Sequence, residues 1–227
     1  MSKLFFGVLI SPDISISRWD TRNVTNMGSM FRKVEPTNSS NIYPGYNGDI
    51  TNWDTSNVTN MAGMFAGNTF VSPSENTASF NQDISTKPIT IAAGTPLQRT
   101  YNAWDVSSVK TFGYTSFNDR NGDDNLGMFA QNYHFNQPIG NWQINTGSGI
   151  DVSLKSMFRN AKAFNQDISS SVVNVGSKTY IAWDTKRVNN LYGTFELSNF
   201  NKPIGNWNLS NVATSRTLFE NNSVFNQ

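Results

Sequence analysis

The 227-residue sequence contains no cysteine and only one histidine, His134. The lack of cysteine excludes disulfides, thiolate metal sites, thiol nucleophiles and lipid anchors attached through cysteine. No pattern in the sequence pairs His134 with a catalytic partner, so we expect its side chain to be solvated or locally hydrogen-bonded. No catalytic signature remains. We therefore predict that the protein is not an enzyme and holds no cofactor or metal.

Charge and long apolar runs are also scarce. The 17 basic and 16 acidic residues are spread along the chain and give a formal net charge of +1, so no basic stripe could follow a phosphate backbone. Residues 4–10 form an apolar stretch far shorter than the roughly 20 residues of a membrane helix. This stretch lacks a small-x-small cleavage site, and we read it as a first strand. We predict no nucleic-acid ligand, no membrane insertion and no clear signal peptide or lipid anchor.

Aromatic residues, in contrast, are abundant and recur in a fixed order. The sequence "WDTRNVTNMGSMF" of residues 19–31 returns as "WDTSNVTNMAGMF" in residues 53–65. All the tryptophans occupy the same slot of this repeat: Trp19, Trp53, Trp104, Trp142, Trp183 and Trp207. A period of this kind is typical of an array of stacked units.

Two further aromatic positions complete the repeat. Each tryptophan is followed by a phenylalanine: Phe31, Phe65, Phe129, Phe158, Phe195 and Phe219. An aromatic-asparagine pair then follows, with its aromatic residue at Phe80, Phe135, Phe164, Phe200 and Phe225. The shortest unit, from Trp183 to Trp207, takes 24 residues and is too small to bury its own core, so the copies must stack.

Local periodicity predicts the shape of one unit. Trp53 and Thr55 alternate with Asp54, which indicates a short strand with the first two side chains inward and the carboxylate outward. The later M-x-x-M-F spacing favours one helical turn. We predict a fold that is mainly β with short helical turns: a single solenoid domain over residues 1–227. It would have six coils and β-hairpin insertions, and residues 1–18 would form an N-terminal strand or hairpin cap.

The pattern I-x-x-W-D-T-S-N-V-T-N-M-x-x-M-F, with a following F-N-Q-D-I, resembles the BspA-like leucine-rich repeats of bacterial surface proteins. It is similar to the variety abundant in mycoplasma lipoproteins, and the resemblance covers residues 16–227. It implies a leucine-rich-repeat-like solenoid displayed on a surface or secreted, with a role in adhesion and host interaction. Similar repeats occur in large viruses. The chain lacks a lipidation cysteine, so the resemblance does not extend to a lipoprotein anchor.

Long insertions distinguish some copies from the others. The copies of Trp104 and Trp183 are preceded by inserts with β-branched segments around a glycine-containing turn, and Tyr101 and Tyr180 lie three residues before these tryptophans. These features predict β-hairpins. Residues 4–19 can be read in the same way, so we predict hairpins on coils one, three and five, projecting from one side. They either carry recognition or only cover the flank of the solenoid.

Two polar patterns offer candidate cation sites. The residues Asp119, Asn121, Asp123 and Asn125 alternate as ligands do in a calcium loop, but Asp124 occupies the glycine position and the final glutamate is missing, so we favour an ordinary polar turn. A second row follows the tryptophans at Asp20, Asp54, Asp105 and Asp184, interrupted by Gln143 and Asn208. It could bind cations or basic partners, but we favour Asx-turns that brace the following backbone.

The N-x-S/T triplets at Asn23, Asn57 and Asn208 lie in or next to the repeat turns, so we interpret their match to the glycosylation motif as incidental.

We predict a non-enzymatic surface or extracellular protein, on a cell or a virion, that binds a protein or glycan on a host or neighbouring surface. The alternative is a structural subunit of a surface, filament or virion assembly. The sequence ends at "VFNQ", where the next coil would begin, and no polar cap is visible there. Self-association or a neighbouring subunit at the C-terminal coil is therefore expected in the alternative.

Overall fold

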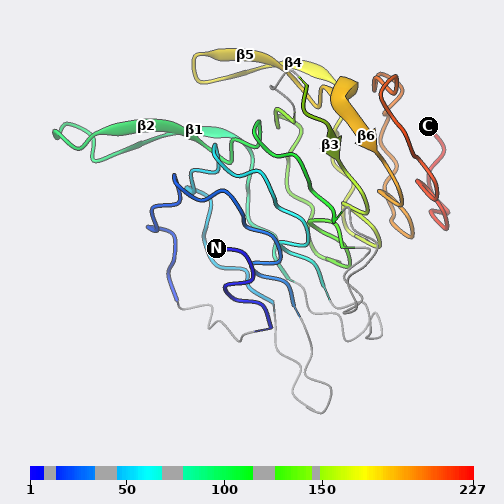
Figure 1. Ribbon diagram of the computed structural model, residues 1–227, viewed down its shortest axis with the longest axis horizontal. Helices are drawn as coiled ribbons and strands as arrows, with labels where there is room; N and C mark the ends of the chain where they lie inside the picture. Colours follow the sequence, from blue (N-terminus) through cyan, green and yellow to red (C-terminus); the bar gives the residue numbers. More distant parts are fainter. Residues whose placement is uncertain (8–13, 34–44, 68–78, 115–125, 145–148) are drawn as a thin grey trace.

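The computed structural model describes residues 1–7, 14–33, 45–67, 79–114, 126–144 and 149–227. The fold is mainly β with almost no helix, as predicted. Successive repeats lie side by side, from the blue N-terminal repeat to the red C-terminal one (Figure 1). The elements are β1 (Lys87–Ile91), β2 (Arg99–Ala103), β3 (Val152–Ser153), β4 (Ser171–Val175), β5 (Lys178–Ala182), the 3-10 helix η2 (Thr185–Arg187) and β6 (Val188–Asn190).

Backbone pairing between repeats is concentrated in one row of parallel bridges. β3 pairs with β6 in parallel, and single bridges extend the row in both directions. Each repeat contributes one residue to it, in the order Asn26, Asn60, Thr111, Ser153, Asn190 and Thr214. The row lies directly before the M-x-x-M-F segment of each repeat, and the parallel pairing in it is very short.

The strand predicted at Trp53 and Thr55 is wrong. Turns close on both sides of this stretch, because Trp53 donates its backbone N–H to Ile50 O at 3.2 Å and Val58 donates to Thr55 O at 2.8 Å. Too little extended chain remains between the turns for a strand ladder. The inward direction of Trp53 and Thr55 is confirmed, since both are 0% exposed. Asp54, predicted to point outward, is only 6% exposed because its carboxylate pairs with Arg99.

The M-x-x-M-F segment forms two consecutive turns instead of the predicted helical turn. Met30 donates to Met27 O at 3.1 Å and Arg32 donates to Ser29 O at 3.3 Å, which are i to i+3 bonds. Ser29 has φ 52 and the equivalent Gly63 has φ 64, so a left-handed residue lies within the first turn of each segment. Alternate amides are then free to bond to the next repeat, which an α-helix would not allow.

The same pattern occurs in residues 1–7, which the sequence was expected to place in a strand. Met1 O accepts from Leu4 N at 3.2 Å, and Lys3 has φ 56. Phe5 donates to Met30 O at 3.0 Å, as Phe31 donates to Met64 O at 2.9 Å. The letters M-S-K-L-F are therefore a further M-x-x-M-F turn, and the strand prediction is wrong over the described part of residues 4–10.

The predicted hairpin before Trp19 is also wrong in its described part. Trp19 donates to Ile16 O at 3.1 Å in a tight turn, the arrangement seen at Trp53 and Trp142. Ile16 is 1% exposed and takes the core position of the equivalent isoleucines. Residues 8–13 lie outside the described chain. The first repeat thus reaches its tryptophan in the same way as the repeats without insertions.

Stacked aromatic rings run through the core. Seven rings follow one another at centroid separations of 5.4 to 5.8 Å, and they are Phe5, Phe31, Phe65, Phe129, Phe158, Phe195 and Phe219. Within a repeat, the ring of the aromatic-asparagine pair stacks on this phenylalanine, as Phe135 does on Phe129 at 3.9 Å. Offset stacking of buried rings adds about 0.5 to 1.5 kcal/mol per pair beyond the area that each ring buries.

The buried tryptophans join neighbouring repeats by hydrogen bonds. The indole N–H of Trp142 donates to Ile84 O at 2.8 Å, and that of Trp183 donates to Ile139 O at 2.8 Å. The same bond is made by Trp53, Trp104 and Trp207 to the isoleucine of the repeat before. Ile16 O, Ile50 O and Ile139 O also accept the backbone N–H of the tryptophan three residues on. The indole bond therefore matters most at Ile84 and Ile168, where an unpaired buried carbonyl would cost about 1 to 3 kcal/mol.

Asparagines form a second inter-repeat ladder at the surface. The side-chain oxygen of Asn47 accepts the backbone N–H of Asn81 at 2.8 Å, and that of Asn81 accepts the N–H of Asn136 at 3.0 Å. The ladder continues through Asn165, Asn201 and Asn226. The asparagine of the aromatic-asparagine pair therefore has a structural role in every repeat where it occurs.

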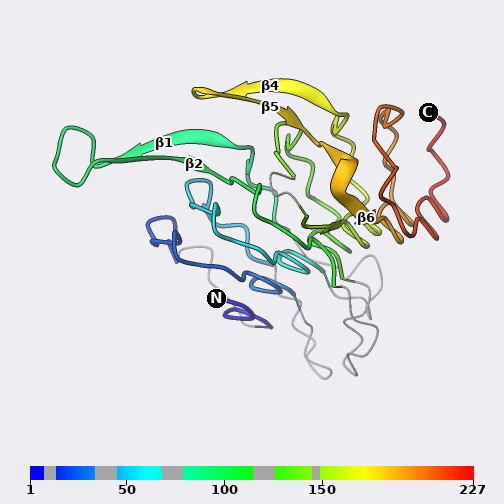
Figure 2. The same cartoon turned by 45° about the horizontal axis from the view of Figure 1, so that its top comes forward.

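The predicted hairpins of the third and fifth repeats are confirmed. β1 pairs with β2 antiparallel, with Lys87 opposite Ala103, and β4 pairs with β5, with Ser171 opposite Ala182. Figures 1 and 2 show both hairpins along the same edge of the molecule, with their loops directed toward the N-terminal repeats. We call them the first arm (residues 87–103) and the second arm (residues 171–182).

We expect Trp142→Ala to lower the free energy of unfolding by about 3 to 5 kcal/mol, because it creates a cavity and leaves Ile84 O unpaired. Chemical denaturation followed by circular dichroism measures this loss. Trp19→Ala is the matched control and should cost less, since Trp19 is 38% exposed whereas Trp142 is fully buried. A loss below about 0.5 kcal/mol for Trp142→Ala would contradict the core assignment.

Candidate binding surface

The two arms are attached to the repeats by the same bond. Tyr101 of β2 donates its hydroxyl to Asn52 O at 2.5 Å, and Tyr180 of β5 donates to Asn141 O at 2.5 Å. Asn52 and Asn141 each directly precede the tryptophan of the repeat before the arm. The tyrosine that lies three residues before Trp104 or Trp183 thus fixes each arm over its neighbouring repeat.

Burial perturbs both tyrosines. It raises the pKa of Tyr180 to about 12, and the nearby carboxylate of Asp105 contributes in the same direction. Burial also raises the pKa of Tyr101, while the guanidinium of Arg99 opposes that shift. Both hydroxyls therefore stay protonated at neutral pH and serve as hydrogen-bond donors.

Arg99 adds a second attachment for the first arm. Its Nη1 lies 3.0 Å from Oδ2 of Asp54, whose side chain is 7% exposed, and its guanidinium lies 4.4 Å from the centroid of the Tyr101 ring. This arginine of the arm therefore covers Asp54. A paired, partly buried carboxylate holds its partner more firmly than an exposed pair does.

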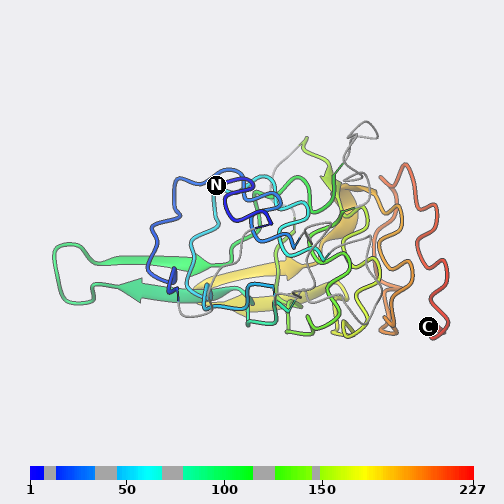
Figure 3. The ribbon, with the colours of Figure 1, turned by 90° about the horizontal axis from the view of Figure 1, so that it is seen from below.

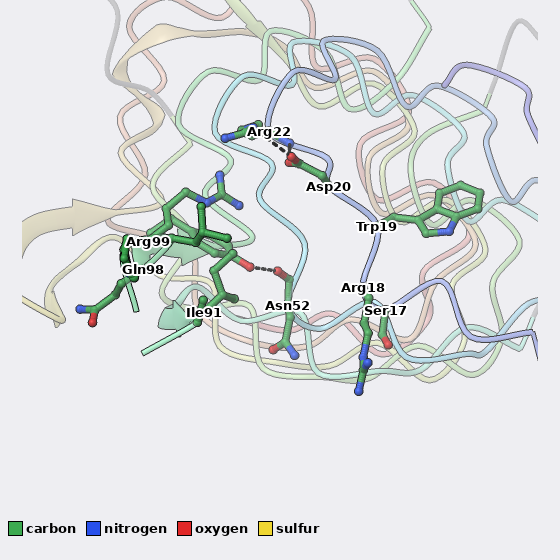
Figure 4. A pocket seen from close by; sticks show the side chains of 13 residues that line it. Ser17, Arg18, Trp19, Asp20, Arg22, Asn52, Ile91, Gln98 and Arg99 are labelled. Carbon is green, nitrogen blue, oxygen red and sulfur yellow. Dashed lines mark hydrogen bonds and ion pairs between the residues drawn. The ribbon is translucent and has the colours of Figure 1, made fainter. Parts of the chain in front are cut away.

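A cleft of about 800 Å³ lies between the first arm and the first two repeats (Figure 4). Residues from three separate segments line it: Ser17, Arg18, Trp19, Asp20, Arg22, Asn52, Ile91, Ala92, Pro96, Leu97, Gln98, Arg99 and Tyr101. The arm supplies one wall, and the turn before and after Trp19 supplies the other. In Figure 4 the indole of Trp19 points away from Ile91 and Arg99, toward the core.

The cleft combines cationic and apolar groups. Arg18, Arg22 and Arg99 contribute three guanidiniums, of which Arg22 pairs with Asp20 and Arg99 pairs with Asp54. On the arm side, Ile91 is 42% exposed and Leu97 is 81% exposed. Arginine offers several N–H donors in a planar fork, so this surface suits a partner with carboxylate or hydroxyl acceptors and some apolar area.

The predicted Asx-turns of the aspartate row are confirmed. Each side-chain oxygen accepts the backbone N–H two residues further on, at 3.0 to 3.3 Å, in Asp20, Asp54, Asp105, Asp184 and Asn208. The same carboxylates also pair with cations of their own chain. These cations are Arg22, Arg99, Lys178 and Lys186, at 2.9, 3.0, 3.8 and 2.8 Å in that order. The row thus has internal partners, which favours its structural role.

The other candidate positions have separate outcomes. Residues 119–125 lie outside the described chain, so the calcium loop stays a prediction. His134 is exposed, and its backbone N–H donates to Asn132 Oδ1 at 3.1 Å. Asn57, the first residue of an N-x-S/T triplet, donates its side-chain amide to Arg22 O at 2.7 Å. This bond joins two neighbouring repeats.

In the described ranges, no group of three or more histidine and acidic side chains is arranged to hold a metal ion. Over the same ranges, no helix combines the length and the apolar character that crossing a bilayer requires.

Sequence reasoning missed the contacts that position the first arm. Asp54 was assigned to an exposed row, and nothing in its local sequence distinguishes it from Asp20. Its partner Arg99 lies 45 positions further along and five residues before Trp104. Lys178 occupies the equivalent place before Trp183 and approaches Asp105. A basic residue at this place in both inserts was the available signal.

Comparison with known proteins gives one family and no closer relative. The family model described as "Mycoplasma protein of unknown function, DUF285" matches residues 1–227. No curated protein and no solved structure matches the chain.

We expect Tyr101→Phe to loosen the first arm and Tyr180→Phe to loosen the second, because each change removes one hydroxyl bond of about 1 kcal/mol. Hydrogen exchange should accelerate in β1 and β2 for the first variant and in β4 and β5 for the second. Each variant is the control for the other. Equal acceleration in both arms, or in neither, would contradict separate attachment by the tyrosines.

Proposed function

The chain belongs to the family of Mycoplasma proteins of unknown function, DUF285, and we propose that it is a non-enzymatic binding protein displayed on a cell or particle surface. Its function is adhesion through a protein or glycan partner on a host or neighbouring surface. The resemblance to BspA-like repeat proteins supports this assignment, as does the arrangement of the two arms.

We propose that the repeats form a solenoid of six coils, each of which carries one of the six tryptophans. The row of parallel bridges through six repeats and the ring stack from Phe5 to Phe219 support this arrangement. A solenoid of this kind is a stiff platform, because each coil is bonded to its neighbours along its backbone, its asparagine and its tryptophan.

The observation that carries the functional proposal is the cleft beneath the first arm. Binding residues are often found on loops that a rigid scaffold positions. Here Tyr101 and Arg99 hold the arm in place, so its exposed side chains, Ile91 and Leu97, face a partner at little cost in conformational entropy. The arginines of the cleft supply hydrogen-bond donors for acidic or hydroxyl-rich groups of that partner.

Binding of fluorescently labelled protein to host cells, matrix proteins and a glycan panel tests the proposal. We expect the wild-type chain to bind at least one of these surfaces saturably. Arg18→Glu, at the wall of the cleft, should weaken that binding by about tenfold, because it reverses one charge of the cleft.

Arg216→Glu in the last repeat is the matched control, since Arg216 is also exposed but lies outside the cleft. It should bind as the wild type does. Equal binding by the Arg18 and Arg216 variants would exclude the cleft as the recognition site, and the lack of saturable binding to every surface would exclude adhesion.

A further inference from the structure

The turn of the second arm rests on the first arm. Gly176, at the turn between β4 and β5, has φ 59, and a Cβ placed on it would lie 3.6 Å from Pro88 Cβ and 4.0 Å from Asn102 Oδ1. Pro88 and Asn102 are opposite each other on β1 and β2, near the base of the first arm. Within one chain, the turn of the second arm therefore already lies against Pro88 and Asn102 of the first arm.

The equivalent pair on the second arm is exposed and more apolar. Ile181 lies two residues before Trp183, as Asn102 lies two residues before Trp104, and it is opposite Val172. Val172 is 70% exposed and Ile181 is 50% exposed. Two adjacent β-branched side chains on the outer face of a hairpin form an exposed apolar surface on which an apolar turn can pack.

The first arm has a matching tip. Its loop, residues 92–98, includes Gly94 with φ 75, and a Cβ placed there would meet no heavy atom within 4 Å. Leu97 in the same loop is 81% exposed. Figure 3 shows this loop extending beyond the blue first repeat and beyond the turn of the second arm.

We propose that the tip of the first arm of one copy packs on Val172 and Ile181 of a second copy. The chain carries both halves of this contact, and it makes the same kind of contact internally, between Gly176 and Pro88. A tip cannot reach its own second arm, because both arms point toward the N-terminal repeats and Tyr101 and Arg99 hold the first arm over the earlier of them. The contact is therefore heterologous: copies join head to tail along the direction of the arms.

This inference goes beyond the adhesive function and does not depend on it. It also differs from stacking through the last repeat, because it uses the arms alone. The tip and the pair are small surfaces, so we expect association that rises with protein concentration between about 1 µM and about 1 mM.

Sedimentation velocity of the full chain tests the contact with two variants. Leu97→Glu changes the tip and keeps the receiving pair, whereas Ile181→Glu changes the pair and keeps the tip. Both residues are exposed, so neither change disturbs the core. The wild type should form concentration-dependent oligomers, and each variant alone should associate at least tenfold more weakly.

An equimolar mixture of the two variants is the decisive sample. It retains one intact tip and one intact pair, so it should form dimers and nothing larger. Ile150→Glu, at an exposed apolar residue outside both arms, should associate as the wild type does. A monomeric wild type at 1 mM, variants that still oligomerise, or a mixture that stays monomeric would each overturn the proposal.

Discussion

The structure depends on a hydrogen bond that no repeat can complete alone. The indole N–H of each buried tryptophan donates to the isoleucine carbonyl of the repeat before it, as Trp183 does to Ile139. Ile139 O also accepts the backbone N–H of Trp142 at 3.1 Å, whereas Ile84 and Ile168, whose repeats continue into an arm, receive the indole bond without this turn bond. Because an unpaired buried carbonyl is costly, stacking is required to satisfy Ile84 and Ile168. The ring stack and the asparagine ladder follow the same spacing and reinforce it.

This constraint separates the interior of the molecule from its variable surface. Positions that bond to the next repeat must stay the same, so the repeated tryptophans, phenylalanines and asparagines leave little room for individual function. The insertions are free of that requirement, because they leave the stack before Trp104 and Trp183 and return to it at a tyrosine. The features offered for binding, the cleft and the exposed pair of Val172 and Ile181, are accordingly both built from the arms.

Much of this arrangement could be predicted from the sequence, because the strongest signals were aromatic. The stacking of the repeats, the inward side chains of Trp53 and Thr55 and the two arms were predicted correctly, whereas the hairpin before Trp19 was not. The position of the strands was not, since the alternation around Trp53 indicates which side chains are buried but not which amides are paired. A strand was wrongly predicted from Leu4 onward because the run of apolar residues there is typical of a strand. The sequence M-S-K-L-F, however, has the same spacing as the M-x-x-M-F turn. The cleft could not be predicted, because it depends on how far the first arm leans over the earlier repeats, which Arg99 and Asp54 decide.

The most direct test of the account is the unfolding free energy of Trp142→Phe, which retains a buried aromatic ring but removes the donor to Ile84 O. Trp19→Phe is the control, since Trp19 is partly exposed. The account predicts a loss of about 1 to 3 kcal/mol for Trp142→Phe beyond that of the control. Equal losses for the two variants would contradict the claim that the indole bond between repeats holds the stack together.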